Sequence, residues 1–292
     1  QRRPATTMTL KASPFLTFIV TAKSRLDHLQ ATLPGLLQQP DCHTIVVDYD
    51  CPQDTKTWVK RNHSKVEVVH VRPRPEFNTS EARNRGALTA RTEWLCFLDA
   101  DVAIAPHFCE TVRPLLDTPC FVRFGRLTPG LSICRREDFL SVGGFDETFR
   151  GWGCEDDDFL TRLRLHRVSE KAAPPELVTI IEHSDEKRMA HRSFRKRWLS
   201  LRINGLYFQI KTDLARQLGL VELPKNELRS IYEEVARVVS GDPDHTVEIR
   251  IALPGRIDFI EPPGWRLRRE WLYRFVPADT HPQANLVHAA QL

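Results

Sequence analysis

The stretch FLTFIVTA, residues 15–22, is a short apolar run rich in β-branched residues, which is typical of a buried β-strand. The next residues, RLDHLQATLPGLLQQ (25–39), place leucines at helical spacing, although Pro34 is expected to kink this helix. The same order continues with TIVVDYD and DTKTWVKRNH, then VEVVHV and TSEARNRGALTAR, and then EWLCFLDADV. Strands that alternate with helices in this way predict an α/β fold, with a mostly parallel sheet flanked by helices.

The pattern changes near Arg195, which predicts a domain boundary. Beyond about residue 192, RSFRKRWLSLRINGLYFQIKTDLARQLGL and NELRSIYEEVARVVSG have helical character, and a proline-rich tail without a clear period follows. We expect a disordered or extended N-terminus over residues 1–14 and an α/β domain over residues 15–194. We expect a mainly helical extension over residues 195–292.

The composition indicates a globular protein and excludes several classes. Hydrophobic residues make up 41% and charged residues 27% of the chain, and the net charge of +4 gives no nucleic-acid signature. The seven cysteines are odd in number and show no CxxC spacing, which argues against a disulfide framework and a zinc ribbon. Reduced, buried thiols in a cytoplasmic protein are expected. No signal peptide is visible, and ASPFLTFIVTA is too short to span a bilayer.

Aspartates end two of the predicted strands. Asp99 and Asp101 in FLDADV are one residue apart, so they point to the same side of an extended strand. Asp48 and Asp50 occupy the same place in VVDYD. Because ligands of such sheets bind beyond the carboxyl ends of the strands, we expect these four side chains to gather at one edge. A pair of carboxylates suits a hard divalent cation, and ordinary strand-end turns are the alternative interpretation.

The stretch RGWGCEDDDF, residues 150–159, joins a glycine-flanked tryptophan to four consecutive acids at the start of a predicted helix. Successive helical residues turn by about 100°, so the four acids cannot all face one cleft. One interpretation is stabilisation of the helix start, where carboxylates interact favourably with the macrodipole. The other is a general base flanked by groups that bind substrate.

The segments FIVTAKSRLDHL, IVVDYD, FNTSEARNRGAL, CFLDADV, GGFDETFRGWGCEDDDFLTRL and IIEHSDEKR, in this order, resemble glycosyltransferases with the Rossmann-like GT-A fold. The chain looks like family 2 enzymes, including chondroitin-polymerase-type chains. It is especially similar to β-1,4-galactosyltransferases around GWGCEDDD and His183. The resemblance covers roughly residues 15–192, and its most specific element departs from the galactosyltransferase form in having Cys154 in place of a glycine. The C-terminal extension has no counterpart in it.

The resemblance implies roles for the acidic run and for a metal site. Asp156 would be the general base, Glu155 and Asp157 would hold acceptor hydroxyls, and Trp152 would stack on the acceptor sugar. Asp158 is assigned mostly to stabilising the helix start. The resemblance further implies that Asp101 and His183 bind Mn²⁺, for which Mg²⁺ or Co²⁺ would also suit this ligand set. A structural hydrogen bond is the alternative role of His183.

At the nucleotide end the resemblance implies a set of donor-binding residues, each of which has the alternative of being an ordinary surface residue. The segment DYDCPQDT departs from the family's usual DDGS pattern, which leaves the roles of its aspartates open. The predicted donor-binding residues are Thr21, Lys23, Arg25, Asp48, Asp50, Phe77, Arg83 and Asp99.

Seven Lys/Arg residues and no acid lie between Lys187 and Arg202, and three interpretations stay open for this segment. It is a lid over the donor diphosphate, as in similar enzymes, a patch that gives peripheral membrane contact, or a solvated helix face. A lipid-linked acceptor would favour the second.

The function implied is that of an inverting, metal-dependent glycosyltransferase of polysaccharide biosynthesis. It would move a hexose or N-acetylhexosamine from a UDP-sugar to a hydroxyl of a glycan acceptor, and the sequence names neither sugar nor acceptor. One alternative is a non-catalytic module that binds sugar nucleotides or glycans on the same scaffold. Another, a sugar-1-phosphate nucleotidyltransferase, is disfavoured because VTAKSRL lacks a GGxGxR-like loop.

Overall fold

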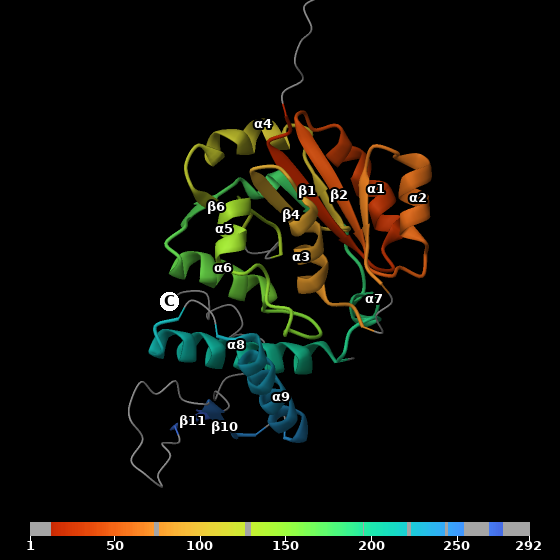
Figure 1. Ribbon diagram of the computed structural model, residues 1–292. Coiled ribbons are helices and arrows are strands. Elements are labelled where there is room, and N and C mark those ends of the chain that lie inside the picture. The colour runs from red at the N-terminus through yellow and green to blue at the C-terminus, as the bar shows by residue number, and fades with distance from the viewer. Residues whose placement is uncertain are drawn as a thin grey trace, which may run out of the picture. The chain divides into compact units, whose positions relative to one another are not determined.

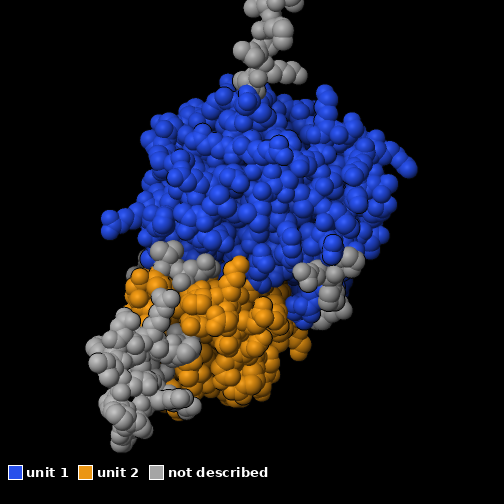
Figure 2. Space-filling view, viewed as in Figure 1, with its two compact units in different colours: residues 1–147, 155–193 blue, residues 148–154, 194–292 orange. Residues whose placement is uncertain are grey.

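The computed structural model divides the chain into two compact units (Figure 2). The first unit comprises residues 1–147 and 155–193, and the second comprises residues 148–154 and 194–292. The predicted N-terminal segment falls outside the described residues up to residue 12, and so does Arg195 at the predicted boundary. The structure describes residues 13–72, 76–125, 130–194, 196–220, 223–242, 245–253 and 269–276.

A seven-stranded sheet with the order β3-β2-β1-β4-β7-β6-β8 organises the described part of the first unit (Figure 1). Strands β3, β2, β1 and β4 are parallel, β7 is antiparallel to both β4 and β6, and β8 is parallel to β6. The strands are β1 (Leu16–Ala22), β2 (Cys42–Asp48), β3 (Glu67–His70), β4 (Trp94–Asp99), β6 (Cys120–Arg123), β7 (Ser132–Arg135) and β8 (Ser169–Ala172).

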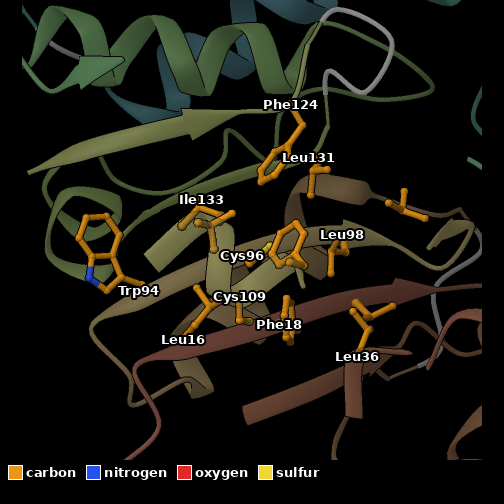
Figure 3. Close-up of a cluster of buried hydrophobic side chains, with 14 of the residues drawn as sticks. Leu16, Phe18, Leu36, Trp94, Cys96, Leu98, Cys109, Phe124, Leu131 and Ile133 are labelled. Carbon is orange, nitrogen blue, oxygen red and sulfur yellow. The ribbon is translucent and has the colours of Figure 1, made fainter. Parts of the chain in front are cut away.

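Helices cover both faces of this sheet, because the side chains of its central strands alternate between two buried clusters. Leu16 and Phe18 of β1 pack with leucines of α1 and with α4 on one face, and Figure 3 shows part of this cluster. Ile19 packs with α3, α5 and α6 on the other face. The helices are α1 (Leu26–Leu37), α2 (Thr55–Asn62), α3 (Thr79–Thr89), α4 (Phe108–Val112), η1 (Arg113–Leu116), α5 (Arg136–Ser141), α6 (Glu155–Leu165), η2 (Pro175–Leu177) and α7 (Asp185–Met189).

Helix α1 continues through Pro34 as one element. The predicted α/β fold with a largely parallel sheet flanked by helices is confirmed.

A small antiparallel pair stands apart from the main sheet and matters for the site. Strand β5 (Val102–Ile104) follows directly after the β4 end and pairs with β9 (Val178–Ile180). The backbone N–H of Ile181 donates to the carbonyl of Asp101 at 2.8 Å. This pairing carries the chain after β9 to the carboxyl end of β4.

The described part of the second unit contains two helices and a β-hairpin. Helices α8 (Arg197–Gln217) and α9 (Lys225–Gly241) pack with β10 (Val247–Leu253), which pairs antiparallel with β11 (Arg269–Phe275). Its core contains Tyr207 and Tyr232, whose rings meet edge to face. Among the described residues of the chain, no helix combines the length and apolar character needed to cross a bilayer.

Candidate active site

Asp99 marks the carboxyl end of β4 at the centre of the sheet. It pairs in register with Thr21 of β1, whose hydroxyl donates to the Asp99 carboxylate at 3.1 Å. On the other side of β1, Ala22 pairs with Asp48, the last residue of β2. The strand ends that carry Thr21, Asp48 and Asp99 therefore lie at one edge, as the alternation of the sequence predicts.

Asp101 and His183 meet directly although 82 residues separate them. The Asp101 Oδ2 atom lies 2.7 Å from the His183 Nε2 atom, and the two side chains are 15% and 6% exposed. The other ring nitrogen, Nδ1, lies 3.3 Å from the carbonyl oxygen of Ser184. A backbone carbonyl at the second nitrogen is the usual way in which a protein orients a metal-binding histidine.

The donor set of this pair fits a divalent cation. Two ligand atoms about 2.1 Å from an octahedral cation and at right angles to each other lie about 3 Å apart. The 2.7 Å separation of the two atoms is close to that value, so a small widening would admit the ion. Within the described residues, no group of three or more His, Cys, Asp or Glu side chains converges at one point. If Asp101 and His183 were the protein ligands, the remaining positions would be open to phosphate oxygens and water.

His28 lies against this pair, which the sequence analysis did not predict. Its ring stacks on His183 with the centroids 5.3 Å apart, and the side chain is 8% exposed. Burial lowers the pKa of His28, and the neighbouring Asp27 carboxylate opposes this effect only in part. His28 occupies a buried position of α1. The sequence RLDHL places His28 on the buried face of a predicted helix, just after a strand end. This position could have identified His28 as a candidate site residue.

Arg83 connects the end of β4 to the start of α6. Its guanidinium donates to Asp99 at 3.4 Å and to Glu155 at 3.3 Å, and the side chain is 1% exposed. Burial alone would lower the pKa of Arg83, but the nearby carboxylates raise it above its ordinary value. From the sequence, Arg83 is predicted to contact the sugar-nucleotide donor. The structure places its charge between two carboxylates, so Arg83 remains protonated and holds them together.

The acids at the start of α6 have different environments. Asp156 is 8% exposed, and burial, followed by the charges of Glu155 and Asp157, raises its pKa to about 8, against the lowering effect of Arg83. Burial raises the pKa of Asp157 as well. A buried carboxyl group with a pKa near neutrality is suited to general-base chemistry.

Asp158 lies in the first turn of α6, as predicted, and it also forms a buried ion pair. Its carboxylate binds the Arg162 guanidinium at 2.8 Å, and both side chains are almost fully buried. Arg162 in turn donates to the carbonyls of Val142 and Gly144. Asp158 therefore anchors α6 to the turn after α5 through an ion pair four residues along the helix.

Asp48, the predicted donor-binding residue that ends β2, is engaged by backbone N–H groups. Asp48 is 2% exposed, and its carboxylate accepts the N–H groups of Cys51 and Lys56 at 2.8 and 2.7 Å. Asp50 adopts a left-handed backbone with φ of 50°. These bonds fix the loop after β2, and direct contact of Asp48 and Asp50 with a nucleotide stays a prediction.

Two of the remaining predicted donor-binding residues, Phe77 and Lys23, lie at the ring of Tyr49. Phe77 meets its ring edge to face at 5.1 Å between centroids, and the Lys23 ammonium lies 5.6 Å from the same ring centroid. Arg25 donates to the carbonyl of Lys187 at 2.8 Å.

The segment after His183 lies against the same edge. The His191 carbonyl accepts the N–H of Phe77 at 2.7 Å, and the ring of His191 contacts the Ser24 hydroxyl at 2.7 Å. Arg192 donates to Thr79 at 2.6 Å and lies over Phe77, and burial lowers the pKa of Arg192 to about 10. Within the basic segment between Lys187 and Arg202, Arg192 is thus packed against the protein. At this residue the segment is not a solvated helix face.

Trp152 belongs to the second unit. The Arg197 guanidinium lies 4.0 Å from the ring centroid of Trp152, and the backbone N–H of Trp152 donates to the Ser200 hydroxyl at 2.6 Å. Three residues later in the chain, Glu155 begins α6.

Two family models match the chain. Residues 17–128 match the model described as glycosyl transferase family 2, and residues 121–187 match the model described as the N-terminal domain of galactosyltransferase. Beta-1,4-galactosyltransferase 4 of Mus musculus is 30% identical over 135 residues, which are 41% of this chain and 39% of that protein. Beta-1,4-galactosyltransferase 3 of Homo sapiens is 25% identical over 249 residues, 76% of this chain and 58% of that protein. The chain thus spans less than two thirds of these relatives' length.

Solved structures share the fold. A mannosyltransferase from Pyrobaculum calidifontis, in complex with GDP-Man and Mn²⁺, has a TM-score of 0.52 at 16% identity and covers 79% of this chain and 76% of that chain. TarS 1-349 of S. aureus, in complex with UDP, has a TM-score of 0.53 at 15% identity, with 77% and 72% covered. The resemblance inferred from the sequence is confirmed: parts of the chain are similar to family 2 glycosyltransferases and to galactosyltransferases, and the chain shares the GT-A fold of the solved glycosyltransferases.

Proposed function

We propose that this chain is an inverting glycosyltransferase that moves a hexose or N-acetylhexosamine from a UDP-sugar to a hydroxyl of a glycan acceptor. The observation that carries the proposal is the meeting of Asp101 and His183 at 2.7 Å, in a unit that also holds a buried carboxyl group, Asp156. The galactosyltransferase relatives and the neighbours bound to GDP-Man and UDP support this class of donor and reaction.

Asp101 and His183 would hold a divalent cation, which when bound would stabilise the negative charge that develops on the leaving diphosphate. Mn²⁺ is the proposed ion, supported by the Mn²⁺ in the mannosyltransferase neighbour and by the carboxylate and imidazole donors. Asp99 and Thr21 line the same edge of the sheet, and Arg83 keeps Asp99 in place from inside the protein.

Asp156 takes the proton of the attacking acceptor hydroxyl in the proposed reaction. The acceptor oxygen bonds to the anomeric carbon from the face opposite the diphosphate. The bond between that carbon and the diphosphate oxygen breaks, and its electron pair leaves with UDP. A base with a pKa of about 8 holds the proton well while remaining partly ionised near neutral pH. Glu155 and Asp157 would bind acceptor hydroxyls, and Trp152 would stack on the acceptor sugar.

A panel of UDP-sugars tests the donor class, with Mn²⁺-dependent UDP release as the measurement. Asp156→Asn should leave UDP binding nearly intact and lower transfer by about 10²–10⁴-fold, the usual contribution of a general base. Asp101→Ala should weaken UDP binding only when Mn²⁺ is present. The matched control is Asp117→Asn, at an exposed carboxylate that pairs with Lys171.

The outcome separates the enzyme from a binding module. UDP titrations of Asp101→Ala that match the wild type, with and without Mn²⁺, would refute the metal site. Near-normal transfer by Asp156→Asn would refute the base. Binding of UDP-sugars without any donor hydrolysis or transfer would favour the non-catalytic module over the enzyme.

A further inference from the structure

The turn that carries Trp152 has an unusual backbone. Gly151 and Gly153 have φ of 75° and 98°, and Cys154 has φ of 71° although it is not a glycine. Three of the four residues 151–154 are thus in the left-handed region, which residues with a side chain seldom adopt. A backbone of this kind persists only where the surrounding structure holds it.

Two side chains of α8 supply that support. The Ser200 hydroxyl accepts the N–H of Trp152 at 2.6 Å and lies 3.1 Å from its carbonyl. The Asn204 amide donates to the carbonyls of Arg150 and Gly153, each at 2.9 Å. Ser200 is 0% and Asn204 1% exposed. The two residues are four apart, so they lie on the same face of α8. Together they bind the turn at Arg150, Trp152 and Gly153.

Helix α9 completes the arrangement through Tyr232. Its hydroxyl donates to the Asn204 side-chain oxygen at 3.0 Å, which orients the amide group toward the turn. The N–H of Arg150 lies 3.3 Å from the same hydroxyl. Tyr232 is 1% exposed, so this network is shielded from water and its bonds are costly to break.

Close packing explains why the residues beside Trp152 are glycines. A Cβ atom on Gly151 would lie 2.3 Å from the Ser200 hydroxyl oxygen, and one on Gly153 would lie 2.6 Å from a methyl carbon of Leu201. The guanidinium of Arg197, one turn before Leu201 on α8, stacks on the indole of Trp152. Helix α8 therefore fixes both the backbone of the turn and the orientation of its aromatic ring.

We propose that Ser200 and Asn204 are positioning residues for acceptor binding, and that α8 and α9 hold the Trp152 turn in the conformation that receives the acceptor sugar. The inference rests on the proposed function, since it takes Trp152 as the residue that stacks on the acceptor. It gives a role to the C-terminal extension, for which the sequence resemblance has no counterpart. The chemical class of ligand is a pyranoside, whose C–H face packs on an indole.

The first test compares Ser200→Ala with Ser230→Ala, a matched control at an exposed serine of α9 whose hydroxyl bonds within its own helix. The acceptors are aryl β-glycosides of glucose, N-acetylglucosamine, galactose and xylose. Loss of the Ser200 bonds should raise the acceptor KM roughly tenfold and change the UDP-sugar KM much less. The control should match the wild type.

The second test is amide hydrogen exchange of peptides covering residues 148–158, which needs no activity. Ser200→Ala and Asn204→Ala should speed exchange there, while Ser230→Ala should not. An unchanged acceptor KM in active Ser200→Ala enzyme, or unchanged exchange of these peptides, would overturn the positioning role. Complete absence of UDP release by the wild type would instead refute the proposed function.

Discussion

The pKa of Asp156 leads to a prediction about the pH dependence of transfer. The group must be ionised to accept the proton of the acceptor, and its pKa of about 8 means that it is mostly protonated at neutral pH. The ionised fraction is about one tenth at about pH 7 and about nine tenths at about pH 9. We therefore expect kcat/KM for the acceptor to rise about ninefold over this interval, with the rate lost as the pH falls.

The assay is UDP release at saturating UDP-sugar and fixed Mn²⁺, with pH varied in overlapping buffers. Glu155→Gln removes the neighbouring charge that raises the pKa of Asp156, so the rising limb of its profile should move to lower pH. A wild-type kcat/KM that stays constant between about pH 7 and about pH 9 would refute the reasoning. So would a rise of kcat/KM centred at about pH 4, the ordinary pKa of an aspartate.

Two further predictions concern stability and cysteine chemistry. Asp158→Asn leaves the buried Arg162 charge uncompensated and should lower the free energy of unfolding by about 3–5 kcal/mol, measured by urea denaturation, whereas Asp117→Asn at the surface should change it little. An unfolding midpoint of Asp158→Asn equal to that of the wild type would contradict this. The pKa of the Cys42 thiol is raised by its hydrogen bond with Cys109 and by burial, so Cys42 should resist alkylation at neutral pH. Both Cys42 and Cys154 are half-buried, so peptide mass spectrometry of the folded protein should show slower labelling of Cys42 than of Cys154, and equal labelling rates would count against the assignment.

The central strands, and the sheet edge where the aspartates lie, could be predicted from the sequence. Short apolar runs alternate with helical segments there, and each of the two aspartate pairs follows directly after an apolar run. Alternation along β1 sends Leu16 and Phe18 to one face and Ile19 to the other, and since both faces are buried the strand is a short apolar run rich in β-branched residues. In the structure, the parallel pairing of β1 with β4 sets Thr21 beside Asp99. This is why a site at the carboxyl ends of the strands is visible in the sequence.

The side-chain partners at the site could not be predicted in the same way. Arg83 and Glu155 are 72 residues apart, and α3 is buried at most of its positions, so no polar face shows which way Arg83 points. Asp48 ends an apolar strand, where a ligand-binding carboxylate is expected. In the structure, its carboxylate accepts hydrogen bonds from backbone N–H groups after β2. Such choices depend on the conformation of loops, which local sequence preference determines only weakly.

The stretch from Arg150 to Phe159 shows how one run of sequence serves two structural units. Its glycines and Trp152 are fixed by α8, whereas the acids that follow belong to α6 and are governed by Arg83 and Arg162. Because Cys154 and Glu155 are consecutive, the chain cannot separate a turn that would receive a sugar from the carboxylate that would activate it by more than a few residues' length.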